Sequence, residues 1–426
     1  MIPRRWLGVL SLLVIVLISY VDRVNVSVLV TDRAFTDHFG ITGDTVAQGA
    51  LTTVFLAGYG LAAFFLTPLY ETVLGVRRGL FVSVGLWAVL TLVSPYAFGA
   101  LALVACRALL GASEGPLFSL KTMYVRDHFT PAEAGKPNAV SSMGVSLGTA
   151  VGLPLVTYLV YSFDWHASFL LLGALNAAIG IPLVWFFVRG RGTPGGSGGG
   201  GRRPSFAATL RLALRTPRLG LILLVEIATL AYLWGSTAWL PSYLLQDRHF
   251  SIKAMGAVSS LPFLMSLCSG FLGGWLLDRL PARRLPLLFV VGSAGTAGCV
   301  LFVIGADTSW AAATGLILAN GFWGLQGPAI PTLVQRCAPA RSVGSAYGVV
   351  NGVGNLVSAL MPTAMGWAIA LAGGSSFGAG FALLAGTQLI TLVCGAWLLA
   401  RPGQLAGPAP SDSTMERSNL ESSRAS

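Results

Sequence analysis

Residues Trp6–Val30 read WLGVLSLLVIVLISYVDRVNVSVLV. This run exceeds the roughly 20 residues that a helix needs to cross about 30 Å of hydrocarbon. It nevertheless contains two charged residues, Asp22 and Arg23. Because a charge is costly at bilayer depth, ionisable residues in such a run mark functional sites by default. The run therefore predicts a membrane helix that carries part of a functional site.

The rest of the chain extends this pattern. Of its 426 residues, 54% are hydrophobic and only 10% are charged, a composition typical of a polytopic membrane protein. Gly and Pro within the runs and the short polar turns favour helices over barrel strands, which would alternate in hydrophobicity. We expect an all-α membrane protein with twelve transmembrane helices, at 6–28, 47–69, 79–95, 97–120, 137–160, 166–188, 219–245, 254–277, 285–304, 310–333, 343–370 and 377–400.

Basic residues are distributed unevenly about these spans. With the N-terminus inside, every Lys and Arg lies on the cytoplasmic side except Arg33, Arg248 and Lys253 outside, and Arg23 and Arg107 within spans. This is the positive-inside bias of an inserted protein, so the net charge of +11 indicates topology and no nucleic-acid partner. We expect a multi-pass protein of the plasma membrane, the bacterial inner membrane, with both termini cytoplasmic.

A glycine-rich break divides the chain. Residues 189–217 include a Gly/Ser run and several arginines, which predicts a flexible cytoplasmic linker. Glu71, Pro131 and Pro154 recur at a nearly constant offset as Asp278, Pro339 and Pro362, as in an internal duplication. The predicted organisation is an N-terminal six-helix half (1–188), the linker (189–217), a C-terminal six-helix half (218–401) and a disordered cytoplasmic tail (402–426).

A short motif occurs at the same place in each half. Gly274-Trp275-Leu276-Leu277-Asp278-Arg279, followed by Arg283-Arg284, resembles the loop signature of the major facilitator superfamily. The first-half copy departs from it, with Thr67 for Gly and Glu71 for Asp. A carboxylate at a helix end, with arginines beyond it, can bind a neighbouring helix N-terminus. A conformational latch is therefore expected from Glu71, Arg77, Arg78, Asp278 and Arg279, against the alternative of a solvated turn.

Longer motifs narrow the resemblance to one group. Within the superfamily the chain resembles, over nearly its whole length, the anion:cation symporter family, which includes sugar-acid and aromatic-acid importers. The resemblance implies a twelve-helix major facilitator fold and substrate contacts that include Tyr59. The motifs are Tyr20–Ser27, Arg107, Leu110-Gly111, Glu114–Phe118, Trp239–Leu244, Asn351, Gly354–Leu356 and Pro362.

Helical periodicity arranges the charged residues. Arg107 and Glu114 are seven residues apart and share a helix face, about 10 Å apart along the axis. Lys121 continues that stripe toward the cytoplasm, where its amine is expected to reach the interface. Asp22 is turned about 100° from Arg23, so the two face different neighbours.

The residue chemistry suggests distinct roles. Arg23 and Arg107 offer fixed positive charge and planar donor forks suited to a carboxylate. Burial disfavours charged carboxylates, so Asp22 and Glu114 are the expected proton carriers. Neutralising Arg107 is expected to abolish substrate binding, which a binding assay would check. Tyr20, Asn351 and Asn355 are further candidate substrate contacts. In the alternative interpretation, Asp22 with Arg107, or Arg23 with Glu114, form buried ion pairs that only fix helix register, while the tyrosines pack and the asparagines link helices.

The predicted function is proton-coupled symport of a small organic anion, a carboxylate such as a sugar acid or an aromatic acid, by alternating access. The alternative is a proton-coupled exporter or an anion exchanger of the same superfamily. No nucleophile-base arrangement and no metal-ligand spacing occurs in the sequence, so neither an enzyme nor a resident cofactor or metal is expected. The expected partners are the substrate anion, protons and the lipid bilayer, with the protein a monomer. Gly144–Leu147 carries no amide side chain, whereas some sugar-acid importers of the family that the chain resembles have one there. Polyhydroxylated sugar acids are therefore a less secure substrate class than aromatic or aliphatic carboxylates.

Overall fold

The computed structural model describes residues 4–70, 74–129, 135–189, 211, 214–337, 343–373 and 376–401. Within these ranges the chain is helical and has no strand. The helices that precede the predicted linker are α1 (Arg4–Leu29), α2 (Arg33–His38), α3 (Thr45–Leu69), α4 (Gly75–Val93), α5 (Ala100–Glu114), α6 (Leu117–His128), α7 (Gly135–Ser162), α8 (Trp165–Leu175) and α9 (Ile181–Phe187), with short turns η2 (Ser94–Tyr96) and η3 (Asn176–Gly180).

The second series follows the predicted linker and has the same general pattern of long helices and short turns. It comprises α11 (Leu219–Ser242), α12 (Ile252–Arg279), α13 (Leu287–Ile304), α14 (Ser309–Gln326), α15 (Ala329–Cys337), α16 (Val343–Ser358), α17 (Met361–Leu371) and α18 (Gly378–Ala400), with η4 (Tyr243–Asp247) and η5 (Ala282–Arg284).

The predicted all-α membrane fold is confirmed. Among the described residues, eleven helical segments are long and apolar enough to cross a membrane. The remaining expected span, 310–333, forms two helices instead, because Gly327-Pro328 separates α14 from α15. Asn320 and Gln326 also make this segment less apolar than the others, and both are buried inside the bundle. Residues 190–210 and 402–426, in the predicted linker and tail, lie outside the described residues.

The outer surface of the bundle is apolar. Phe65, Leu371 and Val393 expose 65%, 71% and 68% of their area. Large apolar side chains at the surface of a helical bundle of this composition are explained by contact with lipid tails in place of water.

Glycines bring the central helices into close contact. A Cβ atom at Gly144, Gly148 or Gly152 on α7 would lie within 3.0 Å of α1, which shows that the two helices pack backbone to backbone. This fixes the position of α1, the helix that carries Asp22 and Arg23, against α7.

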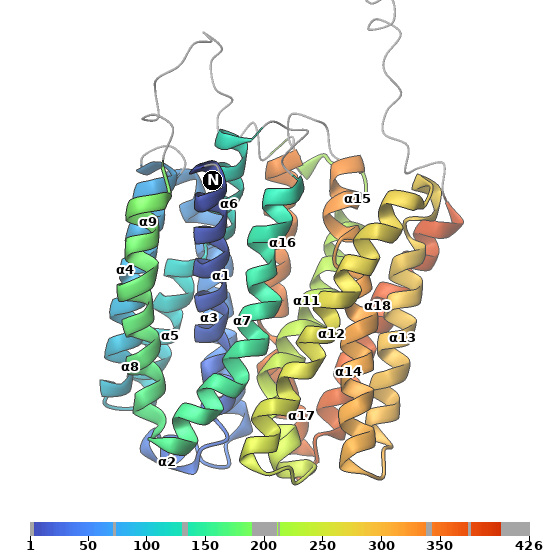
Figure 1. Ribbon diagram of the computed structural model, residues 1–426. Helices are drawn as coiled ribbons and strands as arrows, with labels where there is room; N and C mark the ends of the chain where they lie inside the picture. The colour runs from blue at the N-terminus through green and yellow to red at the C-terminus, as the bar shows by residue number, and fades with distance from the viewer. Residues whose placement is uncertain are drawn as a thin grey trace, which may run out of the picture.

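The two series of helices lie side by side, with the N-terminus and α2 at opposite ends (Figure 1). They meet where α1 contacts α11, α3 contacts α16 and α17, and α7 contacts α12. Near the α2 end, Thr45 Oγ1 donates to Gly366 O at 2.7 Å, and the hydroxyls of Thr53 and Thr363 are 2.7 Å apart. We call this contact of α3 with α17 the α3–α17 seam. It closes the interface at that end.

Candidate functional site

A buried ion pair lies on the α1 face that meets the second series of helices. Arg23 Nε is 2.9 Å from Glu114 Oε2, and the two residues expose 5% and none of their area. Ser19, one helical turn before Arg23, donates its hydroxyl to the same carboxylate oxygen at 2.6 Å. Arg23 and Glu114, which belong to different spans, thus form one hydrogen-bonded unit. Arg23 Nη2 and Glu114 Oε1 have no partner among the described residues.

Asp22 points away from this ion pair. Its Oδ2 accepts a hydrogen bond of 2.6 Å from Asn176 Nδ2, in the turn η3 between α8 and α9. This agrees with the rotation of about 100° between successive helix positions, which places Asp22 and Arg23 against different neighbours. Asp22 therefore faces the interior of the first series of helices, whereas Arg23 faces its border with the second.

Arg107 lies between the two carboxylates. It is 1% exposed, its guanidinium carbon is 4.6 Å from the centre of the Phe55 ring, and both Glu114 and Asp22 interact with it electrostatically. Its Nε and Nη2 have no hydrogen-bond partner within the described segments. Arg107 thus supplies positive charge behind the site, and it does not line the cavities described below.

Aromatic rings surround the Arg23 guanidinium. Its central carbon lies 4.4 Å from the Tyr20 ring centre, 4.6 Å from Tyr59, 5.5 Å from Phe55 and 5.6 Å from Trp234. Faces of aromatic rings attract cations, and more so when water is excluded. The rings hold the guanidinium in place without neutralising its charge, which is balanced by Glu114 in this structure.

The second series contributes amide groups to the same region. Trp234 Nε1 on α11 donates to Asn355 Oδ1 on α16 at 3.0 Å, and Asn355 Nδ2 is 3.0 Å from Asn351 Oδ1. Tyr20 stacks on Trp234, with ring centres 6.3 Å apart, and Tyr59 interacts with both Arg23 and Asn351. The structure therefore brings Arg23, Glu114, Tyr20, Tyr59 and the two asparagines together, with Arg107 and Asp22 behind them.

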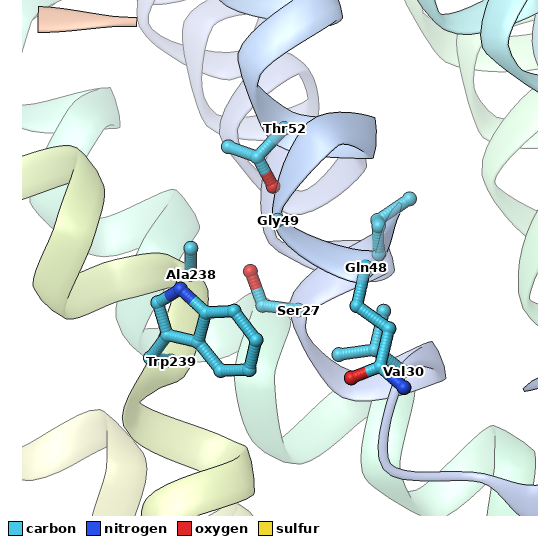
Figure 2. Close-up of a pocket in the computed structure, with 8 residues that line it drawn as sticks. Ser27, Val30, Gln48, Gly49, Thr52, Ala238 and Trp239 are labelled. Carbon is cyan, nitrogen blue, oxygen red and sulfur yellow. The ribbon is translucent and has the colours of Figure 1, made fainter. Parts of the chain in front are cut away.

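Two small adjoining cavities lie between the helix series at this point. One is lined by Arg23, Ser27, Thr52, Phe55, Leu56, Trp234, Thr237 and Ala238. The other is lined by Val26, Ser27, Val30, Gln48, Gly49, Thr52, Ala238 and Trp239, and Figure 2 shows Ser27 and Thr52 beside the Trp239 indole. Each leaves about 10 Å³ for the centre of a water molecule, which is room for about one water. An organic anion needs more room, so the helix series must move apart to admit it.

The predicted latch is only partly described. Glu71 and the side chain of Asp278 lie outside the described residues. Arg77 donates to the Trp185 carbonyl at 2.9 Å, Arg78 is exposed, and Arg279 stacks on Trp275 at 4.0 Å. Arg77 and Arg279 thus contact tryptophans of their own helix series, and the latch stays a prediction.

Two further charged residues are buried: Lys121, which was expected at the membrane interface, and Glu226, which was not among the predicted site residues. Lys121 was expected to reach the interface, but it is 4% exposed and its amine donates to Ser142 Oγ at 2.6 Å. The expectation was wrong because α6 packs against α7, so that its end is covered. Glu226 on α11 is 5% exposed and lies against Gly354 of α16.

Polar partners of the site were also missed by sequence reasoning. Ser19 and Asn176 bind the two carboxylates, yet neither is charged or part of a motif. The sequence could have indicated only one of these two partners. Ser19 is four residues before Arg23 and therefore lies on the same helix face, whereas nothing in the sequence pairs Asn176 with Asp22. In the described part of the chain no group of three or more His, Cys, Asp or Glu could hold a metal ion.

Comparison with known proteins gives consistent matches. Residues 12–362 match the Major Facilitator Superfamily profile. The D-galactonate transporter of Escherichia coli is 27% identical over 91% of this chain and 94% of its own length. A probable sulfoacetate transporter of Cupriavidus necator is 29% identical over 85% and 86%, and a probable galactarate/D-glucarate transporter of Escherichia coli is 23% identical over 92% and 94%.

Solved structures share the fold. The inward-facing, unoccupied structure of a bacterial homolog to the human lysosomal transporter Spinster has a TM-score of 0.73 at 16% identity, covering 95% of this chain and 98% of that one. A D-xylose-proton symporter has a TM-score of 0.73 at 12% identity, with 92% and 96% covered.

Proposed function

The chain belongs to the Major Facilitator Superfamily, and we propose that it imports a small organic anion, a carboxylate such as a sugar acid, together with protons. Members of this superfamily are transporters, not enzymes, and the many apolar helices make the chain a multi-pass membrane protein. The observation that carries the proposal is the Arg23–Glu114 ion pair beside a cavity between the two helix series.

The anion specificity rests on Arg23. Its guanidinium lines the cavity, remains charged at any working pH and has Nη2 free of partners among the described residues. A guanidinium can bind both oxygens of a carboxylate in a bidentate arrangement. The relatives named for galactonate, for galactarate and glucarate, and for sulfoacetate all concern acids. The names of the galactonate and galactarate/glucarate relatives support sugar acids as the substrate class, which the absence of an amide side chain at Gly144–Leu147 had made less secure.

Proton coupling follows from competition for that guanidinium. A charged Glu114 occupies Arg23 through Nε, so an incoming carboxylate competes with it for the same donors. A proton on Glu114 removes this competitor and releases Arg23 to the substrate. Proton binding and anion binding then favour each other, as linkage requires. Asp22, on the other side of Arg107, would be a second proton carrier whose charge acts on the site through that arginine.

The second helix series would complete the substrate site. The amides of Asn351 and Asn355 can both donate and accept, which suits hydroxyl groups on an acid's carbon skeleton. Tyr59 contacts Arg23 of one series and Asn351 of the other, so it would contact substrate bound between them. Tyr20, stacked on Trp234, would cover the apolar face of the ligand.

The transport cycle would be alternating access by rocking of two halves, 1–188 and 218–401, joined by residues 189–217. We place the protein in the bacterial inner membrane as a monomer, with both termini and residues 402–426 in the cytoplasm. The α3–α17 seam then lies at the outer end. Glu71, Arg77, Arg78, Asp278 and Arg279 would hold the inner end closed in the opposite state.

Gly366 tests this account of the outer end. A Cβ there would lie 2.2 Å from Thr45 O, so the seam must part to accept even alanine. Overpacking costs of about 1–3 kcal/mol would shift the two-state population roughly five- to 150-fold toward the outward-open form. We expect Gly366→Ala to raise the labelling of Thr53→Cys by a membrane-impermeant thiol reagent at least about fivefold. The background is a chain whose five native cysteines are replaced.

The control for this experiment is Gly386→Ala on α18, where an added Cβ meets nothing within 4 Å. Its labelling should equal that of the parent chain. Unchanged labelling in Gly366→Ala would show that the seam does not govern access from this side.

Ligand-induced stabilisation tests the proposed substrate class. The purified protein would be heated with D-galactonate, galactarate, sulfoacetate, an aromatic acid and, as the opposite charge, a lipophilic amine. A ligand present at 100 times its dissociation constant stabilises by about 2.7 kcal/mol. We expect at least one acid to raise the unfolding temperature and the amine to leave it unchanged. Stabilisation by the amine alone would reverse the charge assignment.

A further inference from the structure

Lys121 is a buried cation to which the proposed mechanism gives no role. It lies on α6, exposes 4% of its area, donates to Ser142 Oγ at 2.6 Å and lies 4.6 Å from the centre of the Phe118 ring. No carboxylate of the described residues lies within ion-pair distance of its amine. A charge kept at bilayer depth with a hydroxyl and a ring as its only described partners is costly to maintain. Such a charge calls for an anion that the protein itself does not provide.

An unbroken row of rings links Lys121 to the substrate arginine. The Lys121 amine lies over Phe118, the Phe118 ring meets the Tyr20 ring edge to face at 6.5 Å, and the Tyr20 ring lies 4.4 Å from the Arg23 guanidinium. The two cations therefore lie along one continuous wall. Since Tyr20 also stacks on Trp234 of the second helix series, this wall borders the space between the two series.

The distance along this wall suits a short molecule with two acidic ends. Gly115-Pro116 separates α5, which ends at Glu114, from α6, which carries Lys121, so the row of rings and not the rise of one helix gives the spacing. The three contacts of that row measure 4.6, 6.5 and 4.4 Å, so the Lys121 amine and the Arg23 guanidinium carbon are at most about 16 Å apart. With a charge-assisted hydrogen bond of about 2.8 Å at each end, an extended sugar diacid lies within this limit.

The charges in the first helix series have the matching sign. Arg23, Arg107 and Lys121 are three buried cations, whereas Asp22 and Glu114 are two buried acids. Arg23 is paired with Glu114, and Arg107 interacts with both acids, so Lys121 is the cation in excess. When protonated Glu114 releases Arg23 to the first acidic group of a ligand, Lys121 still lacks an anionic partner, and a second acidic group would supply one.

We propose that Lys121 binds the second acidic group of the substrate, and that the transporter selects diacids, dicarboxylates or sulfo-carboxylates, over monoacids of the same skeleton. This inference rests on the proposed function, because it takes Arg23 as the site of the first acidic group. It gives Lys121 a role in specificity, distinct from the proton coupling assigned to Glu114. Ser142 would hold the amine in place until the ligand arrives.

The test compares two acids that differ at one carbon. Galactarate carries a carboxylate where D-galactonate carries a hydroxymethyl group, so the ratio of their dissociation constants isolates the second charge. We expect the wild-type protein to prefer galactarate, and Lys121→Met, which keeps an unbranched side chain, to lower this preference about ten- to 100-fold, or about 1.4–2.8 kcal/mol. Lys121→Arg should retain most of the preference, because it keeps the charge.

The matched control is Lys253→Met, at the start of α12, whose amine stacks on Tyr161 at the opposite end of the bundle. It should leave the ratio unchanged. An equal loss of affinity for both acids in Lys121→Met would mean that Lys121 only holds α6 against α7, and it would overturn the proposal. So would a wild-type preference for the monoacid. If the wild-type protein binds neither these nor any other acid, the proposed function itself fails, and this inference fails with it.

Discussion

Replacing Arg23 by glutamine is expected to weaken binding of the transported anion by about 30-fold or more. Truncating one member of a buried, hydrogen-bonded charge pair costs about 2–5 kcal/mol, and the substrate carboxylate would lose its only guanidinium that lines the described cavities. Arg23→Lys should lose less, because it keeps the charge but not the planar fork. Isothermal titration with the acid that stabilises the protein best measures both effects.

Two further variants separate binding from folding. Arg23→Gln leaves Glu114 buried with Ser19 as its remaining described partner, which destabilises the fold by itself. The double variant Arg23→Gln with Glu114→Gln removes both charges, so its unfolding temperature should recover while its affinity does not. Arg33→Gln is the surface control, because that side chain is 86% exposed. Wild-type affinity in the double variant would show that Arg23 does not bind the anion.

Replacing Glu114 by glutamine is expected to abolish accumulation driven by a proton gradient while exchange of the anion continues. Glutamine has the shape of the protonated acid and no proton to release, so Arg23 stays available to the substrate at every pH. In the wild-type protein, affinity should fall as pH rises, because charged Glu114 competes for Arg23. In the variant this dependence should flatten toward the tighter, low-pH value.

Two assays on one preparation of vesicles distinguish these effects. Counterflow, in which unlabelled anion inside draws in labelled anion, needs no proton movement and should persist in Glu114→Gln. Uptake driven by an acidic exterior should fall to the level without a gradient. If the variant still concentrates the anion, Glu114 is not the coupling residue, and Asp22, bound to Asn176, becomes the principal candidate.

Much of the site could be predicted because charge is rare in apolar helices. Asp22, Arg23, Arg107 and Glu114 stand out from sequence alone, and helix periodicity correctly turns Asp22 away from Arg23. Hydropathy also located the spans, although breaks at Gly115-Pro116, at Gly327-Pro328 and at residues 359–360 divide the fourth, tenth and eleventh into two helices each. These features depend on residues that are close together in the sequence, so they can be predicted without knowing which helices pack together.

What could not be predicted depends on which helices pack together. Lys121 was expected at the membrane surface, since its burial depends on α7 covering the end of α6 through Ser142. Asn176 carries no charge and no motif, and its contact with Asp22 requires α1 to lie beside η3. The sequence allowed Asp22 to pair with Arg107 or Arg23 with Glu114, and the observed Arg23–Glu114 pair depends on the relative positions of α1 and α5. Periodicity within a single helix does not contain this information.

The measurement that tests the central claim most directly uses proteoliposomes with a pH-sensitive dye trapped inside. The vesicles would receive a panel of sugar acids, aromatic acids and dicarboxylates, with Glu114→Gln vesicles in parallel. Proton-coupled import predicts internal acidification on addition of at least one acid, and none in the variant. An anion exchanger would leave the interior pH unchanged while labelled acid still enters, and an exporter of cationic compounds would move protons only with an amine. Either of these results would contradict the account.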